Sequence, residues 1–330
     1  MRRYYRPILS EGEGLPLAGG PFAFARAEVL TRAGHEGFIA AADLPDDWRD
    51  HLTRPRPLPA RLGQVASLPL IMGVLNITPD SFSDGGRNAA PAIAIAAAQA
   101  MHAAGAGLID LGAESTRPGA AALPVADELA RLAPLWAGLA GLPVSIDTRN
   151  AAVMATAIDA GACLVNDVSA LTHDPAAAAL VAARAAPVVL MHHQGTPATM
   201  QAAPHYDDAL LDVFDWLERR IAAAVAAGIS RDNIIADPGI GFGKGLTHNL
   251  ALLRGLALFH GLGVPILLGA SRKSLISNVA GDVPVAQRLP GSLAIALAGA
   301  QAGVQMLRVH DVAETVQAIR LWRACHPALT

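Results

Sequence analysis

Small polar and charged residues follow short apolar runs at many places along the chain. Four of them are Asp147, Asn166, Asp237 and Lys273, and each comes at or just after the end of such a run. Their side chains offer hydrogen-bond acceptors and donors in alternation. Gathered around one cavity, they would suit a flat, nitrogen-rich heterocycle that carries both N–H groups and a carbonyl.

A second set of residues offers cationic and neutral donor groups. Arg308 and His310 lie close together near the end of the chain, and Asn76 and Thr116 follow earlier apolar runs. Guanidinium groups bind phosphate oxygens well, and an amide oxygen can help to hold Mg²⁺. The set therefore predicts a diphosphate site in which Mg²⁺ shares the charge.

These residues need elements that bring them together, and the chain after residue 70 has a repeating pattern. Short β-rich runs alternate with longer helical runs, about eight times over roughly 240 residues. The alternation favours the α/β class and a (β/α)8 TIM barrel. The runner-up, a doubly wound open sheet, would normally carry a glycine-rich dinucleotide loop after its first strand, where this chain has Asn76 and then Ile-Thr-Pro.

A barrel would explain why the chemically useful residues are scattered along the sequence. The carboxyl ends of all eight strands meet at one mouth, so residues far apart in sequence become neighbours. Residues 71–76, an uncharged run that ends in polar groups, are typical of a buried strand that feeds an active-site loop. The residues predicted at the mouth are Asn76, Asp110, Asp147, Asn166, His193, Asp237, Lys273, Arg308 and His310.

Residues 1–66 do not show the repeated alternation of short β-rich runs and longer helical runs that marks the rest of the chain. We predict that they form an N-terminal extension and linker, and that the barrel occupies residues 67–330. Residues 22–30 alternate loosely enough for a strand, and residues 37–41 could pair with it. Residues 54–59 read Arg-Pro-Arg-Pro-Leu-Pro, which is a stiff linker. We expect a structural role for the extension, because nothing in it indicates chemistry.

The composition limits the partners and the compartment. The formal net charge of −3 gives no electrostatic footprint for nucleic acid or for an anionic membrane, and we expect neither as a partner. The longest uncharged stretch, residues 89–109, is mostly alanine and is a poor transmembrane span. Two cysteines make no disulfide framework, and residues 1–14 lack the apolar core of a signal peptide. These features predict a cytoplasmic protein.

Two motifs invite other assignments. The glycine-rich residues 239–245 have Pro238 where a phosphate loop needs its first glycine, and Gly245 where it needs Ser or Thr. We interpret them as a mobile loop that bears Phe242 and Lys244. The adjacent His192 and His193 are weak evidence for a metal, because a barrel metal hydrolase would place His-x-His after the first strand.

Seven stretches of the sequence resemble dihydropteroate synthases. The likeness runs over almost all of residues 70–325 and is carried by MGVLNITPDSFSDGG, LIDLGAESTRPG, SIDT, VND, DPGIGFGK, SRKS and RVHD. The resemblance implies the reaction of 6-hydroxymethyl-7,8-dihydropterin diphosphate with 4-aminobenzoate, which yields 7,8-dihydropteroate and pyrophosphate. It also implies Mg²⁺ as the cofactor and a homodimer.

The resemblance further implies roles for residues that match the family's motifs. The pterin would be held by Asp147, Asn166, Asp237 and Lys273. Asn76 would ligate Mg²⁺ on the diphosphate, which would be bound by Thr116, Arg308 and His310. The aminobenzoate pocket would be walled by Phe82, Pro118 and Phe242, with Ser274 at the substrate carboxylate. Two closing loops would carry Asp84 and Arg117, so that the expected catalytic residues are Asp84, Arg117, Asp147, Asp237 and Lys273.

One position departs from the family pattern. The family usually has His-Met-Gln-Gly after the fifth strand, whereas this chain has His-His-Gln-Gly, with His193 in place of the methionine. Methionine would present a soft apolar surface to the pterin, and His193 brings a titratable group to the same substrate-binding position.

Two other classes of protein would use a similar barrel. A methyltetrahydrofolate–corrinoid methyltransferase would share the pterin residues, but it would have no use for the Ser-Thr-Arg-Pro stretch at 115–118 or for Arg308 and His310. A non-catalytic pterin-binding paralogue should have lost Asp84 or Arg117, and both are present.

Overall fold

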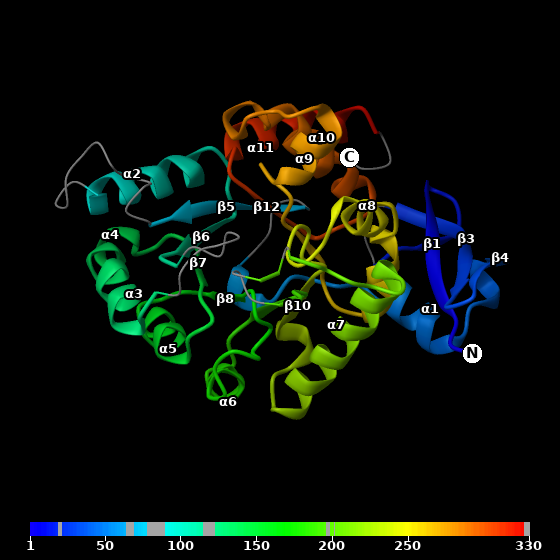
Figure 1. Cartoon of the computed structure of the whole chain (residues 1–330), viewed down its shortest axis with the longest axis horizontal. Helices are drawn as coiled ribbons and strands as arrows, with labels where there is room; N and C mark the ends of the chain where they lie inside the picture. The colour runs from blue at the N-terminus through cyan, green and yellow to red at the C-terminus, as the bar shows by residue number, and fades with distance from the viewer. Residues whose placement is uncertain are drawn as a thin grey trace.

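The computed structural model describes residues 1–18, 22–63, 69–77, 90–114, 123–195, 199–200 and 202–326. At its centre lies a parallel sheet with the strand order β10-β9-β8-β7-β6-β5-β12-β11. The strands are β5 (Leu70–Asn76), β6 (Leu108–Gly112), β7 (Val144–Asp147), β8 (Leu164–Asp167), β9 (Val188–Met191), β10 (Ile234–Asp237), β11 (Leu267–Leu268) and β12 (Met306–Val309). A parallel bridge between Ala236 and Ile266 joins the two ends of the sheet. The sheet therefore closes into the predicted barrel, with helices around it (Figure 1).

The inner face of the barrel changes character along the strands. Residues two apart on a strand point to the same side. Towards the amino-terminal ends, the inner side chains form one apolar cluster of Leu70, Met72, Leu108, Leu164, Val189, Ile235, Leu267 and Met306, together with Leu62. Two residues further along, the same face carries Asp110, Asn166, Asp237 and Arg308. The barrel is thus apolar at one end and polar at the other.

Helices follow the strands and cover the barrel from outside. They are α2 (Ala90–Ala103), α3 (Val125–Leu132), α4 (Trp136–Leu139), α5 (Ala151–Asp159), α6 (Ala177–Ala183), α7 (Ala209–Ala226), α8 (Leu246–Arg254), α9 (Ser274–Ala280), α10 (Leu289–Gln301) and α11 (Val312–Ala324). Short 3-10 segments add η4 (Ala133–Leu135), η5 (Arg231–Asn233), η6 (Leu256–Leu262) and η7 (Val285–Gln287). In the described part of the chain, none of the helices has the length and apolar character needed to cross a membrane.

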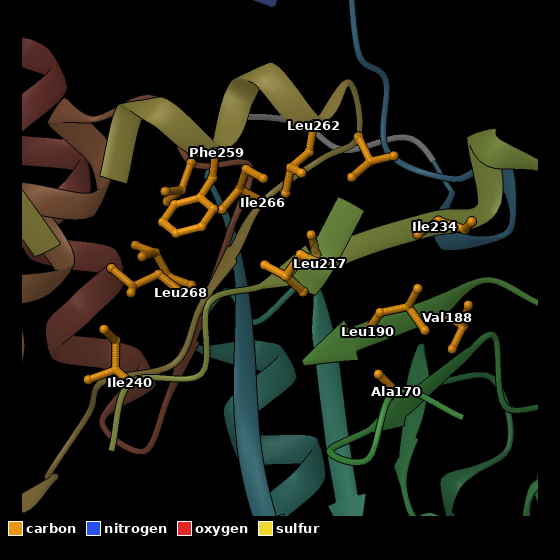
Figure 2. Close-up of a cluster of buried hydrophobic side chains, with 14 of the residues drawn as sticks. Ala170, Val188, Leu190, Leu217, Ile234, Ile240, Phe259, Leu262, Ile266 and Leu268 are labelled. Carbon is orange, nitrogen blue, oxygen red and sulfur yellow. The ribbon is translucent and has the colours of Figure 1, made fainter. Parts of the chain in front are cut away.

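Apolar side chains fill the space between the barrel and this helical layer. Leu217 of α7 and Phe259 of η6 belong to the same buried cluster as Leu190 of β9 and Leu268 of β11 (Figure 2). The N-terminus of α7 is capped by Asp208, whose carboxylate accepts hydrogen bonds from two backbone N–H groups at 3.0 and 3.1 Å. Capping and apolar burial together explain why this segment forms a stable helix.

The N-terminal extension forms a small antiparallel sheet of its own. Its elements are β1 (Tyr4–Glu11), β2 (Leu15–Pro16), β3 (Phe22–Thr31), β4 (Gly34–Ala40), η1 (Ala41–Asp43), α1 (Asp46–Thr53) and η2 (Ala60–Leu62). The predicted pairing of residues 22–30 with 37–41 is confirmed, with Ala27 opposite Ile39. Strand β1 pairs with the other edge of β3 and was not predicted. The boundary predicted at residue 66 falls in 64–68, outside the described residues, and stays a prediction.

The extension packs against α7 and η6 on one side of the barrel (Figure 1). Trp48 of α1 stacks on Phe214 of α7 with ring centroids 5.6 Å apart. The Tyr4 hydroxyl donates to Asp215 at 2.8 Å, and Arg2 forms an ion pair with Glu218. The linker then brings Leu62 into the apolar inner cluster of the barrel. Aromatic burial and charge pairing therefore hold the extension in place.

Candidate active site

A network of charged and amide groups occupies the mouth, the carboxyl-terminal end of the barrel. Arg308 donates from Nε to Asp110 Oδ2 at 2.6 Å and from Nη2 to Asp147 Oδ2 at 2.8 Å. Asn166 Nδ2 donates to the same Asp110 oxygen at 3.0 Å. Four strands thus contribute one connected set of hydrogen bonds, and three of its members were predicted as site residues. Asp110 was predicted at the mouth but was given no role there.

The second part of the site is formed by Asp237 and Lys273. Asp237 ends β10 and is buried, and its Oδ1 accepts from the backbone N–H of Gly239 at 2.7 Å. A Cβ on Gly269 would stand 3.7 Å from Asp237 Oδ2 and 3.7 Å from Arg308 Cβ. Both charged groups therefore border the same small space. Lys273 Nζ donates to the carbonyl of Ile240.

The charges in this network shift one another's titration. Burial raises the pKa of Asp147 to about 7 against the opposing attraction of Arg308, and the negative charge of Asp110 adds to the rise. Burial also raises the pKa of Asp237, which Lys273 opposes. Loss of hydration lowers the pKa of Lys273 to about 8. Burial alone would lower the pKa of Arg308, but Asp110 and Asp147 outweigh it and raise the pKa, so Arg308 stays a cation.

A buried lysine fixes the glycine-rich loop after β10. Lys244 is 2% exposed, and its Nζ lies 2.8 Å from His192 Nδ1 and donates to the carbonyls of Gly239 at 2.8 Å and Phe242 at 3.0 Å. Burial and the neighbouring Lys244 charge lower the pKa of His192 to about 2, so its imidazole is neutral and Nδ1 can accept a hydrogen bond. This loop was expected to be mobile. Its packing instead ties it to the end of β9.

The loop also places Phe242 beside the mouth. Lys273 Nζ lies 4.6 Å from the centre of the Phe242 ring, a cation–π contact. The next residue, Ser274, is exposed at the start of α9. The two predicted aminobenzoate contacts in the described part of the chain are therefore both neighbours of Lys273.

His310 and His193 lie at the edge of the site. His310 follows β12, and both its backbone N–H and its Nδ1 approach the Ser271 hydroxyl, at 3.2 and 3.1 Å. His193 is half-buried, and its ring meets Trp216 of α7 edge to face with centroids 6.0 Å apart. The imidazole that replaces the family's methionine thus rests on an aromatic wall of the barrel.

Several residues with a part in the site were not assigned one from the sequence. They are Asp110, Glu114, Arg149, His192, Lys244 and Ser271. Glu114 follows β6 and accepts from Arg149 at 2.7 Å and from the backbone N–H of Leu123 at 3.1 Å. A polar residue just after a buried strand was the available signal for Glu114. The predicted residues Phe82, Asp84, Thr116, Arg117 and Pro118 lie outside the described residues.

The oxygen-bearing side chains at the mouth suit a metal ion that takes most of its ligands from water and substrate. Within the described ranges, no cluster of three or more His, Cys, Asp or Glu side chains could hold a metal ion. Asn76 pairs with Gly112, which pairs with Asp147, so these residues stand side by side at the rim. A single amide oxygen in this position suits Mg²⁺, which keeps several waters and is often shared with substrate phosphates.

Comparison with known proteins identifies the class of this barrel. The family of pterin-binding enzymes matches residues 72–310, which include all eight barrel strands except the first two residues of β5. The chain therefore belongs to the pterin-binding enzymes.

Individual relatives narrow the family further. The dihydropteroate synthase of Escherichia coli (strain K12) is 45% identical over 261 residues, which are 78% of this chain and 92% of the relative. A structure of Xanthomonas albilineans dihydropteroate synthase with 4-aminobenzoic acid has a TM-score of 0.76 and 44% identity and covers 82% of this chain and 98% of its own. A structure of the same enzyme with 7,8-dihydropteroate has a TM-score of 0.73 at 42% identity over the same shares, 82% and 98%. Within the pterin-binding enzymes, the relatives of this chain are dihydropteroate synthases.

Proposed function

We infer that this chain is a dihydropteroate synthase, a transferase of folate biosynthesis. It joins 6-hydroxymethyl-7,8-dihydropterin diphosphate to 4-aminobenzoate and releases 7,8-dihydropteroate and pyrophosphate. One observation carries the inference. The segment shared with the pterin-binding enzymes contains the strands that bring Asp147, Asn166 and Asp237 together with Arg308 at one mouth.

We propose that the polar residues of the mouth bind the pterin ring. A pterin presents N–H donors along one edge, and ionised carboxylates such as Asp237 are suited to accept from them. Asn166 and Lys273 supply donors for the ring nitrogens and the carbonyl. Because these groups already hydrogen-bond to protein atoms that fix their positions, the ring would meet a preorganised set of partners.

The reaction needs charge of both signs at two neighbouring points. When the C–O bond of the pterin methylene breaks, its electron pair leaves with pyrophosphate and positive charge develops on the pterin. Asp147 and Asp237 would stabilise that positive charge, while Arg308 and His310 stabilise the leaving group. The amine nitrogen of 4-aminobenzoate then forms the C–N bond and loses a proton to solvent. Since no covalent intermediate is required, no nucleophile–base pair is needed.

We propose that Asn76 holds Mg²⁺ together with the diphosphate. Bound there, the ion would add positive charge next to the departing oxygen. We propose further that the aminobenzoate ring lies against Phe242, with its carboxylate near Ser274 and the cation of Lys273. The contact of Lys273 with Phe242 supports this placement.

We also propose that the enzyme is a cytoplasmic homodimer. Family resemblance supports the dimer, and two free cysteines, Cys163 and Cys325, suit a reducing compartment. Light scattering on the purified protein should give twice the chain mass of 34.0 kDa. A particle of the chain mass would contradict the dimer.

A product assay tests the function directly. Purified enzyme with Mg²⁺ and both substrates should form dihydropteroate and pyrophosphate in equal amounts, and omission of 4-aminobenzoate should stop dihydropteroate formation. Pterin binding without turnover would favour a non-catalytic paralogue. Methyl transfer from methyltetrahydrofolate to a corrinoid would favour the methyltransferase class.

A further inference from the structure

A cavity of about 1020 Å³ lies at the opposite end of the barrel from the mouth. One wall is formed by the end of α1 and the linker, and the other by the turns that precede β10 and β11. Asn233, which directly precedes β10, lines the cavity, whereas Asp237 ends that strand at the mouth. We call this space the linker cavity.

Arg56 of the linker lines the cavity, and no carboxylate lies within ion-pair distance of its guanidinium in the described chain. The residue is 7% exposed, its Nη1 donates to the Val264 carbonyl at 3.3 Å, and its Nη2 is shielded from solvent and has no hydrogen-bond partner in the protein. Its nearest titratable neighbour is His260, with Nδ1 at 3.4 Å from Nη1. Burial and the charge of Arg56 lower the pKa of His260 to about 3, so this neighbour stays neutral and adds no second positive charge.

A second arginine faces the same space from the barrel. Arg231 of η5 donates to the Leu262 carbonyl, and its Nη2 lies 3.2 Å from the point where a Cβ on Gly263 would stand. His51 approaches the same point to 3.0 Å. Among the residues that the structure describes, neither Arg56 nor Arg231 forms an ion pair, whereas Arg54 pairs with Asp50 at 3.0 Å.

Neither guanidinium has a carboxylate within ion-pair distance in the described chain, although the more distant charges of Asp50 and Asp232 favour the cationic forms of Arg56 and Arg231. Burial, then the positive charge of Arg231, lowers the pKa of Arg56 to about 10, so the side chain is still charged at neutral pH. A buried charge without a partner destabilises the folded chain. Both guanidinium groups offer forked N–H donors that match the oxygens of a phosphate group.

We propose that the linker cavity binds a small phosphorylated molecule, whose phosphate lies between Arg56 and Arg231. The remaining wall suits the rest of such a ligand. Pro55, Pro57 and Pro59 form a stiff apolar surface, and Asp50 and Asp232 can accept hydrogen bonds from hydroxyl or amino groups. The volume is in the range of pockets that enclose small organic molecules rather than a bare ion.

One wall of the site would belong to the extension and the other to the barrel. The family match begins at residue 72, so the entire linker wall of the cavity precedes it. A ligand held by both arginines would bridge the linker and the barrel. The bound ligand should therefore slow local unfolding of the linker, which hydrogen exchange measures.

Phenyl phosphate, inorganic phosphate and malonate are the probes for this proposal, with calorimetry for affinity and hydrogen exchange of residues 50–63 as the local measurement. In wild type, phenyl phosphate should slow exchange in this segment at least threefold and bind more tightly than phosphate or malonate. Arg56→Gln and Arg231→Gln should each weaken that binding at least tenfold. Arg26→Gln, which removes a charge from the extension away from the cavity, should bind as wild type does.

Further variants separate this site from the active site and from misfolding. Arg308→Gln, which alters the mouth, should leave the exchange effect in residues 50–63 unchanged. Arg56→Lys should restore part of the binding, and Arg231→Gln keeps the test decisive if Arg56→Gln does not fold. Absence of the exchange effect in wild type, or its loss only in Arg308→Gln, would overturn the proposal. Equal binding of malonate would overturn the phosphate preference.

Discussion

Along β8 the inner face changes from Leu164 to Asn166, and along β10 from Ile235 to Asp237. The first residue of each pair belongs to the apolar inner cluster, and the second belongs to the polar mouth. Burial of the apolar groups stabilises the fold by roughly 25 cal/mol per Å² of apolar surface. Burial of the charged groups costs free energy, which pairing offsets only in part. Two residues along a strand thus separate side chains that stabilise the barrel from side chains whose burial is explained by the chemistry of the site.

The largest expected effect of a single change falls on the apolar end. Leu164→Ala removes a fully buried side chain from the inner cluster. Its free energy of unfolding should fall by about 2–5 kcal/mol, while kcat/KM of the folded fraction stays near wild type. Denaturant unfolding, followed by steady-state kinetics, checks this. Leu321→Ala, at a residue that is 65% exposed, is the matched control and should change neither quantity.

A smaller effect, on both stability and activity, is expected in the glycine-rich loop after β10. Gly239 has φ of +67°, and a Cβ there would stand 1.9 Å from the His192 carbonyl oxygen. Gly239→Ala should lower the free energy of unfolding by about 1–3 kcal/mol and lower kcat/KM at least tenfold, because the loop that carries Phe242 must shift. In the same loop, a Cβ on Gly245 would meet only His248 Nδ1 at 3.8 Å. Gly245→Ala should therefore be nearly neutral, and equal damage in both variants would refute this account of the loop.

The charged mouth should also give stability a pH dependence. Asp147 has a folded pKa near 7 against an ordinary value of 3.8, so the folded protein binds its proton more tightly than the unfolded chain does. The stability from this group is present below pH 4 and is lost as the pH rises to about 7. Wild type should therefore lose more stability than Asp147→Asn between pH 4.5 and pH 7.5. An equal change in the free energy of unfolding of both proteins between the two pH values would show that Asp147 does not titrate there.

The smallest effect is expected at the position that departs from the family pattern. His193 rests on Trp216 at the edge of the mouth, and a methionine can make the same kind of contact with an aromatic ring. His193→Met should change kcat/KM by less than about threefold at neutral pH. A loss of tenfold or more would mean that the imidazole takes part in binding or catalysis.

The sequence predicted the regular part of the molecule better than the irregular part. Asp147, Asn166, Asp237 and Arg308 were predictable because each ends or nearly ends a short apolar run, and a barrel must bring such ends together. Their contacts with one another could not be predicted, because the pairing of Arg308 with Asp110 depends on the positions of strands far apart in the sequence.

The misses have physical reasons of their own. Seven residues with four glycines suggested a mobile loop at 239–245, because nothing in the sequence reveals the acceptors that surround Lys244. Strand β1 contains Pro7, which is unfavourable inside a sheet but is tolerated on an edge strand. The packing of Trp48 on Phe214 joins residues that no periodicity connects.

The central claim is that the polar end of the barrel binds the pterin, and Asp237 tests it most directly. Calorimetry should compare the binding of 6-hydroxymethylpterin to wild type and to Asp237→Ala, with denaturant unfolding of both proteins measured in parallel. Loss of a charge-assisted contact should weaken pterin binding by about 2–3 kcal/mol, which is roughly 30- to 150-fold, while the protein stays folded. Equal affinity in the two folded proteins would contradict the claim and remove Asp237 from the site.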